Sequence, residues 1–274
     1  MAFIFQPGRK AYTPLLILFG LAVQFAQADE KPKQGFRELQ RFPAAEAHQA
    51  VAVDKTSFFA ISSREIARYQ KTTGKQLAKW TPPKESTIRH LNSGVVIEGK
   101  LYCAHSNWPK QPLENSIEVF DATTLKPLES LKFPKTTGAI NWVDRQHDKW
   151  WVVFAFYGDA ESVKKTRLVL YNDNWQQKGR WTFPETVVKR FLPYSNSGGA
   201  WGPDNLIYVT GHDRAELYAL QINRSNEILE HVKTLPAPIA GQGIAWDRSD
   251  KNTLYGIIRS KKQVVKMRFM PAVK

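Results

Sequence analysis

The chain alternates short apolar runs with polar turns, and helical spacing of apolar residues is nearly absent. Five segments share one outline, in which small and apolar residues lead to an acidic or turn residue. They are residues 48–54, 92–98, 138–144, 197–203 and 241–247. Runs of this length that are bounded by turn residues predict β strands.

These five segments recur at a regular interval along the chain. Their last residues are separated by 44, 46, 59 and 44 positions, which suits a four-stranded propeller blade. We attribute the long third interval to a polar insertion at residues 158–165. The sequence therefore predicts an all-β fold, a five-bladed β-propeller with these segments as its inner strands.

Further strands are expected after each inner strand, because runs rich in aromatic and β-branched residues follow. The second strands are 57–62, 101–106, 150–156, 206–211 and 254–260, and the third are 64–69, 116–121, 167–172, 216–221 and 263–268. The last repeat ends soon after Phe269, before a fourth strand can form, whereas residues 36–42 are strand-like and unassigned. We expect this N-terminal strand to close the ring as the outer strand of the last blade, which removes exposed sheet edges.

Residues 1–28 have the pattern of a secretory signal peptide. Arg9 and Lys10 precede an apolar core at 15–25, and Ala-Gln-Ala at 26–28 resembles a cleavage site. The core is shorter than a membrane span. We expect an exported protein, periplasmic or secreted and without stable membrane insertion, whose residues 29–274 form a single propeller domain. A membrane anchor or a buried strand is the alternative.

Charge and cysteine content narrow the choice of partners. The formal charge of +14 is spread over turns and strand ends, without an arginine-rich arm, a zinc finger or an aromatic RNA-binding strand. This argues against a nucleic-acid partner and favours a solvated basic surface, with attraction to anionic polymers or envelope lipids as the alternative.

The single cysteine, Cys103, occupies an inward strand position, where we expect a packed side chain rather than a nucleophile.

The histidines are concentrated where a propeller would gather them. The loops that enter the inner strands and those between the second and third strands lie on one face of such a ring, and four of the six histidines fall in or beside them. The predicted binding residues for a small polar ligand or a peptide are His90, Asn92, His105, Asn107, Asn196, Gln242 and Arg259. His48 belongs to the same face.

The pair His212 and Asp213 is the candidate catalytic group, because imidazole titrates near neutral pH and a neighbouring carboxylate can orient it. Alternatively, both side chains cap loops. Several histidines around an axis could hold a transition metal. However, the chain has no H-x-x-x-H, no H-E-x-x-H and no acidic calcium loop, so we assign no metal ligands and expect no cofactor, with a transition metal as the alternative.

Segments along most of the chain resemble a family of exported bacterial β-propellers that are mostly uncharacterised and loosely labelled cycloisomerase-like. The resembling segments are HLNSG (90–94), AHSNWP (104–109), NSIEVFDATTL (115–125), DKWWVVFAFYG (148–158), SGGAWG (197–202), YVTGHD (208–213) and GQGIAWDRS (241–249). Residues 99–106, 115–128 and 241–247 are more distantly similar to blades of the plant-type glutaminyl cyclotransferases, which are also five-bladed. HLNSGVV stands where that family has a segment of the F-T-Q-G-L type, and no active-site residue transfers from it.

Three functional hypotheses follow from these features. The first is a propeller enzyme that cyclises, isomerises or eliminates within a small polar or carboxylate-bearing substrate. In it, His212 carries the proton, Asp213 orients His212 and Arg259 holds the anionic group. The second is a non-enzymatic propeller of the periplasm or envelope that binds a ligand or a protein, and the third is a metal-dependent lyase or oxidase.

Overall fold

The computed structural model describes residues 1, 2, 34–135 and 138–271. The chain divides into a unit of Met1–Lys31 and a unit of Pro32–Lys274. The proposed signal peptide therefore lies almost entirely outside the described residues. No helix in the described part of the chain has the length and apolarity needed to cross a membrane.

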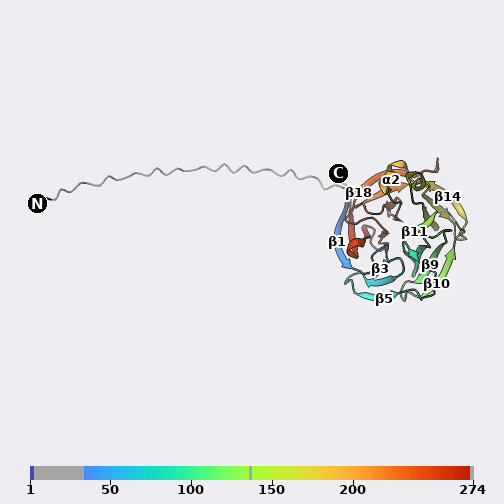
Figure 1. The fold of residues 1–274 in the computed structure, drawn as a ribbon, viewed down its shortest axis with the longest axis horizontal. Coiled ribbons are helices and arrows are strands. Elements are labelled where there is room, and N and C mark those ends of the chain that lie inside the picture. The colour runs from blue at the N-terminus through green and yellow to red at the C-terminus, as the bar shows by residue number, and fades with distance from the viewer. Residues whose placement is uncertain (3–33, 136–137, 272–274) are drawn as a thin grey trace. The chain divides into compact units, whose positions relative to one another are not determined.

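The unit from Pro32 onward is a five-bladed β-propeller, and the predicted fold class is confirmed (Figure 1). Blade 1 contains β2 (Ala50–Val53), β3 (Ser57–Ile61), β4 (Ile66–Gln70) and β5 (Gln76–Trp80). Blade 2 contains β6 (His90–Leu91), β7 (Val95–Ile97), β8 (Lys100–Ser106), β9 (Asn115–Asp121) and β10 (Pro127–Lys132). Blade 3 contains β11 (Ala139–Gln146), β12 (Lys149–Ala155), β13 (Arg167–Tyr171) and β14 (Gln177–Thr182).

The remaining strands complete the ring. Blade 4 contains β15 (Gly198–Trp201), β16 (Ile207–Thr210), β17 (Glu216–Gln221) and β18 (Glu230–Pro236). Blade 5 contains β19 (Ala245–Trp246), β20 (Thr253–Ile258), β21 (Gln263–Met270) and β1 (Gly35–Pro43). Around the axis, the inner strand of each blade contacts the inner strand of the next, in the closed cycle β2, β7, β11, β15, β19 and back to β2.

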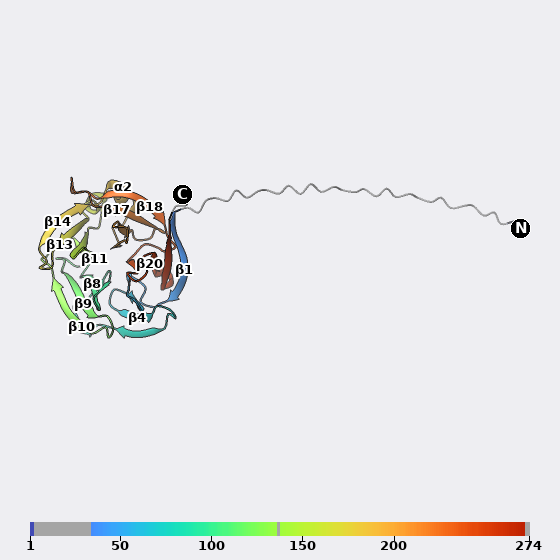
Figure 2. The ribbon, with the colours of Figure 1, turned by 180° about the vertical axis from the view of Figure 1, so that it is seen from behind.

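The N-terminal strand closes the last blade, as the sequence predicts. β1 pairs antiparallel with β21 over its whole length, and Figure 2 shows the two strands side by side at the edge of the ring. Phe42 packs on Phe58 of blade 1, with 4.9 Å between ring centroids. This strand therefore joins two blades that lie at opposite ends of the sequence.

Two short helices between blades 3 and 4 refine the sequence interpretation. The polar insertion at residues 158–165 contains α1 (Ala160–Val163), capped by the Asp159 side chain. A second helix, α2 (Glu185–Phe191), lies between β14 and β15 and was not predicted. Its Val187, Val188 and Phe191 are buried, but seven residues are too few to give a clear helical period. The long third interval therefore comes from both helices.

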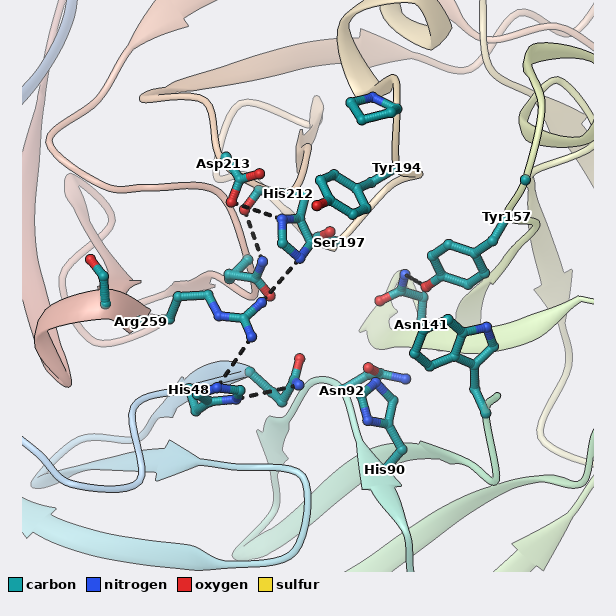
Figure 3. Close-up of a pocket in the computed structure, with 16 residues that line it drawn as sticks. His48, His90, Asn92, Asn141, Tyr157, Tyr194, Ser197, His212, Asp213 and Arg259 are labelled. Atoms are coloured by element: carbon teal, nitrogen blue, oxygen red, sulfur yellow. Dashed lines mark hydrogen bonds and ion pairs between the residues drawn. The ribbon is translucent and has the colours of Figure 1, made fainter. Parts of the chain in front are cut away.

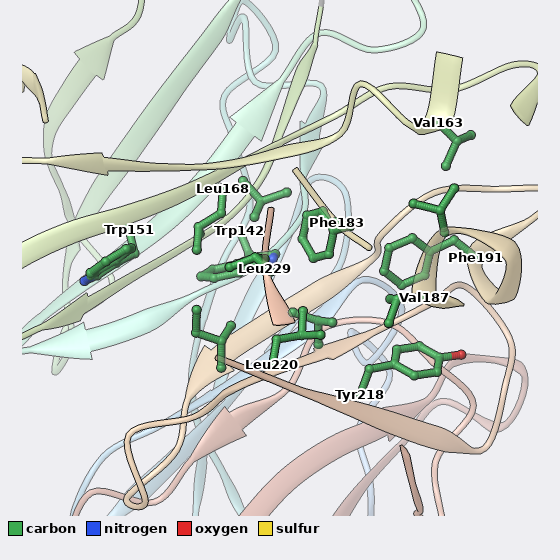
Figure 4. Close-up of a cluster of buried hydrophobic side chains, with 14 of the residues drawn as sticks. Trp142, Trp151, Val163, Leu168, Phe183, Val187, Phe191, Tyr218, Leu220 and Leu229 are labelled. Atoms are coloured by element: carbon green, nitrogen blue, oxygen red, sulfur yellow. The ribbon is translucent and has the colours of Figure 1, made fainter. Parts of the chain in front are cut away.

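The core lies between neighbouring blades rather than inside one of them. Figure 4 shows the cluster between blades 3 and 4, where Trp142, Trp151 and Leu168 meet Tyr218, Leu220 and α2. The inner-strand tryptophans Trp142, Trp201 and Trp246 are all buried, as blade-to-blade packing requires. Cys103 is also buried, and burial raises the pKa of its thiol, which makes it a packing residue.

Candidate functional site

A cavity of about 800 Å³ opens at the face of the ring predicted to carry the site (Figure 3). Its wall combines imidazoles and a guanidinium, a carboxylate, amides and hydroxyls, and aromatic rings. The lining residues are His48, Gln49, His90, Asn92, Trp108, Asn141, Tyr157, Gly158, Pro193, Tyr194, Ser197, His212, Asp213, Gln242, Arg259 and Ser260. All five blades or the loops between them contribute, and we call this space the mouth cavity.

Arg259 extends into the mouth cavity from a single 3₁₀ turn, η1 (Arg259–Lys261), between β20 and β21. Its Nη1 lies 3.0 Å from Nε2 of His212, and its Nη2 lies 3.1 Å from Nε2 of His48. A guanidinium can only donate hydrogen bonds. Both imidazoles must therefore accept at Nε2, so each is neutral and carries its proton on Nδ1.

The charge of Arg259 is not neutralised by a direct ion pair. Among the residues that the structure describes, no carboxylate oxygen lies within 4.0 Å of its guanidinium nitrogens. The nearest acid in the chain of contacts is Asp213, on the far side of the His212 ring. Arg259 thus presents a positive charge to the cavity while two neutral rings fix its orientation.

Two histidines of the cavity wall have lowered pKa values. His90 lines it, and burial, followed by the repulsion of His105, His48 and Arg259, lowers the pKa of His90 to about 4. Burial is also the main cause that lowers the pKa of His48, followed by Arg259. Because imidazoles with lowered pKa values stay neutral near pH 7, Arg259 supplies the positive charge of this wall.

A chain of side-chain contacts connects the two histidines of blades 1 and 2. The Nε2 atom of Gln49 donates to Oγ of Ser63 at 3.1 Å, and that Oγ lies 3.3 Å from Nδ1 of His90. The amide of Gln49 also lies 3.5 Å from Nδ1 of His48. Ser63 thus links Gln49 to the His90 ring, whereas the Gln49 amide only lies beside the His48 ring.

The structure brings the predicted catalytic pair together. Nδ1 of His212 lies 2.7 Å from Oδ1 of Asp213, although the two atoms are not aligned as a hydrogen bond. The Tyr194 ring stacks on the imidazole, with 4.0 Å between centroids and 25° between planes. Since Nε2 accepts from Arg259, His212 can take a proton from a ligand only when that guanidinium donor turns away.

Three of the predicted binding residues, Asn92, Gln242 and His90, line the mouth cavity together with Arg259. Asn92 donates from Nδ2 to the Ile140 carbonyl at 3.0 Å, which joins blades 2 and 3. Gln242 has φ 67° and donates from Nε2 to the His212 carbonyl at 2.8 Å. Both amides are therefore held by the backbone of a neighbouring segment.

Three other predicted binding residues do not line it. His105 is buried within blade 2, where Nε2 accepts from the Arg89 amide and Nδ1 lies 2.9 Å from Ser116 Oγ. Asn107 bridges its own loop, to the Pro112 carbonyl and the Glu114 amide. The structure thus places His105 in contacts within blade 2 and Asn107 in contacts within the loop that follows β8.

Asn196 is the third, and it is fully buried between inner strands. Its Oδ1 accepts from Trp142 Nε1 at 2.9 Å, and its Nδ2 donates to the carbonyls of Gly198 and Thr210. The adjacent glycines are equally crowded: a Cβ on Gly198 would lie 2.5 Å from the Gln242 carbonyl oxygen. Asn196, Gly198 and Gly199 thus serve the packing of the inner strands, whereas Ser197 lines the cavity.

Residues that the sequence did not single out complete the wall. Asn141 lies in the predicted inner strand 138–144, donates from Nδ2 to Tyr157 Oη at 3.2 Å and also bonds the Asn196 carbonyl. Gln49 and Tyr194 line the cavity as well. In the sequence, only the position of an amide within an apolar inner strand could have pointed to Asn141 as a site residue. A buried structural role explains that position equally well.

The histidines do not converge on a metal-binding arrangement. Within residues 34–135 and 138–271, no three His, Cys, Asp or Glu side chains are close enough to share a metal ion. The Nε2 atoms of His48 and His212 both face the Arg259 guanidinium. The positive charge of this guanidinium would repel a metal cation. The donor set therefore suits an anion better than a metal.

No known protein-family model and no curated protein matches the chain. A solved structure of a luciferin-regenerating enzyme is similar, with a TM-score of 0.51 and 9% identity over 86% of this chain and 98% of that one. Hydrazine synthase from Kuenenia stuttgartiensis has a TM-score of 0.45 and 10% identity over 79% of this chain and 69% of that one. A chain of the mitotic checkpoint complex has a TM-score of 0.44 and 9% identity over 94% of this chain and 99% of that one.

At such low identity these likenesses concern the fold. The luciferin-regenerating enzyme supports the β-propeller-type architecture of this chain. The chemistry of the mouth cavity must be inferred from its own residues.

Proposed function

We propose that this propeller recognises a small carboxylate-bearing ligand in the mouth cavity, with Arg259 holding the carboxylate. The observation that carries the proposal is the guanidinium, which faces the cavity between two neutral histidines and has no ion-pair partner among the described residues. A planar guanidinium can bind both oxygens of a carboxylate at once. The pattern of residues 1–28 extends the proposal to a protein that acts after export.

Direct titration of the protein tests this proposal. Calorimetry with D-galacturonate, L-malate and L-glutamate is compared with D-galactose and the amides of the two other acids. Arg259→Gln should weaken binding of the acids about tenfold to hundredfold, because a charged hydrogen-bonding group is lost. Lys261→Gln is the matched control, since Lys261 lies in the same 3₁₀ turn, is exposed and does not line the cavity. Equal effects of the two substitutions, or equal binding of acids and neutral analogues, would contradict the proposal.

A specific contact favours chemistry on the bound acid as a second candidate function. His212 carries its proton on Nδ1, 2.7 Å from the Asp213 carboxylate, and its Nε2 is held unprotonated by Arg259. When a carboxylate draws the Arg259 donor away, Nε2 becomes a free base beside the ligand. Such a base, next to a carboxylate, can remove a proton in a cyclisation, isomerisation or elimination.

Hydrogen exchange tests proton transfer without knowledge of the net reaction. Proton NMR in D₂O follows the C–H bonds beside the carboxylate of each acid that binds. Wild-type protein should exchange such a proton, and His212→Gln should lower the rate about 10²-fold or more. His147→Asn is the control, because His147 is exposed, has φ 53° and does not line the cavity. Binding without any exchange would identify the site as a binding site alone.

A further inference from the structure

Trp108 and Tyr157 form a wall that two hollows share. Both residues line the mouth cavity and also a neighbouring groove of about 290 Å³, which we call the side groove. Their ring centroids lie 5.3 Å apart, and the Trp108 ring lies 5.8 Å from His90. Trp108 is nevertheless 39% exposed. A large flat ring at the boundary of two adjacent hollows is placed to contact a ligand that extends from one into the other.

The side groove adds its own charge to that of Arg259. Lys165 lines it, is exposed and has no acidic partner within 4.0 Å in the described part of the chain. Its neighbour Lys164, by contrast, pairs with Glu161 at 2.7 Å. The charge of Lys165 helps to lower the pKa of Asp159, but neither Lys165 nor Arg259 forms a direct ion pair with a described acidic residue, so a ligand that spans the two hollows can carry two acidic groups.

The mouth cavity also presents oxygen atoms that need hydrogen-bond donors. Asn141 is 2% exposed, and its Nδ2 is used by Tyr157 and Asn196. No described residue donates to its Oδ1, which points toward the open centre in Figure 3. Gln242 has the same arrangement: its Nε2 is bonded to the His212 carbonyl, and Oε1 receives no donor from the residues described. Hydroxyl groups on a ligand would satisfy both oxygens.

Apolar contacts in the mouth cavity are restricted to aromatic rings and one proline. Among the described residues that line it, none is Val, Leu, Ile, Met, Phe or Ala. A peptide with apolar anchors would find no matching pocket there. Flat aromatic faces combined with acceptor oxygens and an arginine instead match a hydroxylated ring that carries a carboxylate.

We propose that the ligand is an acidic oligosaccharide built from uronic acid units; this deepens the proposed function and rests on it. One unit lies in the mouth cavity, with its carboxylate on Arg259 and its hydroxyls donating to Asn141 Oδ1 and Gln242 Oε1. The next unit stacks on Trp108 and enters the side groove, where Lys165 meets its carboxylate. The formal charge of +14 on the chain would attract such a polyanion.

Calorimetric titration with sugars of increasing length tests this inference on the folded protein. The probes are D-galacturonate with its α-1,4-linked dimer and trimer, the corresponding β-1,4-linked mannuronate series, and neutral galactose oligomers. For at least one acidic series, the dimer should bind about tenfold more tightly than the monomer, as one good aromatic contact provides. The neutral oligomers should show no such gain.

Two substitutions of Trp108 test whether the tighter binding of the dimer depends on this residue. Trp108→Ala should bring the dimer-to-monomer affinity ratio close to one, whatever it does to the affinity for the monomer, and Trp108→Phe should keep part of the ratio. Leu128→Ala is the control, since Leu128 is 53% exposed on strand β10 and lines neither hollow. Thermal unfolding of each variant confirms that it is folded.

The outcomes separate this inference from the proposed function. If a uronate monomer binds through Arg259 but the dimer gains nothing, or if Trp108→Ala leaves the gain intact, the two-unit inference is overturned and the carboxylate site stands. If no uronate binds while other carboxylates do, or if an oligoglutamate peptide shows the Trp108-dependent gain instead, the sugar class is overturned. If no carboxylate of any kind binds, the proposed function fails as well.

Discussion

Arg259 donates a hydrogen bond from Nη2 to Nε2 of His48 at 3.1 Å, across 211 positions of sequence. The contact joins blade 5 to the loop that enters blade 1, on the two sides of the closure of the ring. It also settles the protonation of His48, because a guanidinium has no lone pair to offer.

The first prediction follows from this contact and depends on the carboxylate site. His48→Leu removes an acceptor that positions Arg259 and should weaken binding of a carboxylate about threefold to tenfold, the worth of one hydrogen bond. His48→Gln, whose side-chain oxygen can accept in its place, should retain most of the affinity. Calorimetry measures both. Equal losses in the two variants would show that His48 contributes shape rather than a hydrogen bond.

The second prediction concerns acid stability. Burial, followed by the repulsion of Arg89, lowers the pKa of His105 from the usual 6.5 to about 4. Below pH 6.5 His105 is protonated in the unfolded chain, whereas in the folded protein it stays neutral down to about pH 4. Stability should therefore be full above pH 6.5 and fall as the pH drops toward 4, by about 3 kcal/mol for this one group.

Urea unfolding at several pH values measures this dependence. His105→Gln should lower stability at pH 7, because contacts with Arg89 and Ser116 are disturbed, and should flatten the fall between pH 6.5 and 4. His147→Asn, which removes a histidine at an exposed position, is the control variant. An unaltered slope in His105→Gln would mean that other groups carry the pH dependence.

The third prediction assigns Asn196 to architecture. Asn196→Ala leaves the buried Trp142 Nε1 and the carbonyls of Gly198 and Thr210 without the partners they have now. We expect a loss of about 2–3 kcal/mol or more in the free energy of unfolding, with ligand affinity preserved in the folded fraction. Asn174→Ala, at an exposed turn position, should cost little. Loss of affinity at unchanged stability would restore Asn196 as a binding residue.

The fourth prediction concerns the closing strand. Phe42 is 2% exposed and packs against Phe58, so Phe42→Ala should destabilise the protein by about 3–5 kcal/mol. Leu39→Ala in the same strand, at a 38% exposed position, should cost far less. Deletion of residues 36–42 should lower the melting temperature of the whole ring in a single transition. A deletion protein with the wild-type melting temperature would show that β1 is dispensable for closure.

The sequence by itself determined the architecture, because each blade repeats the same local signals. The strands of the five repeats and the closing strand at residues 36–42 agree with the structure, except that the predicted inner strand 241–247 is reduced to Ala245–Trp246. The alternation of apolar and polar residues and the turn residues can be recognised within a few positions of sequence. Because the blades repeat about every 44 residues, each of these patterns occurs again in the next blade. The sequence did not predict helix α2, since seven residues are too few to show a helical period of apolar positions.

The site depended on tertiary structure. Loop position alone placed His48, His90, His212, Asp213 and Arg259 on one face, and the structure gathers them around one cavity. Sequence could not tell His105 from His90, although both lie in blade 2, because the direction of a side chain at a strand end depends on register and local twist. It also could not show that Arg259 lies between two imidazoles, a contact that exists only because the ring closes.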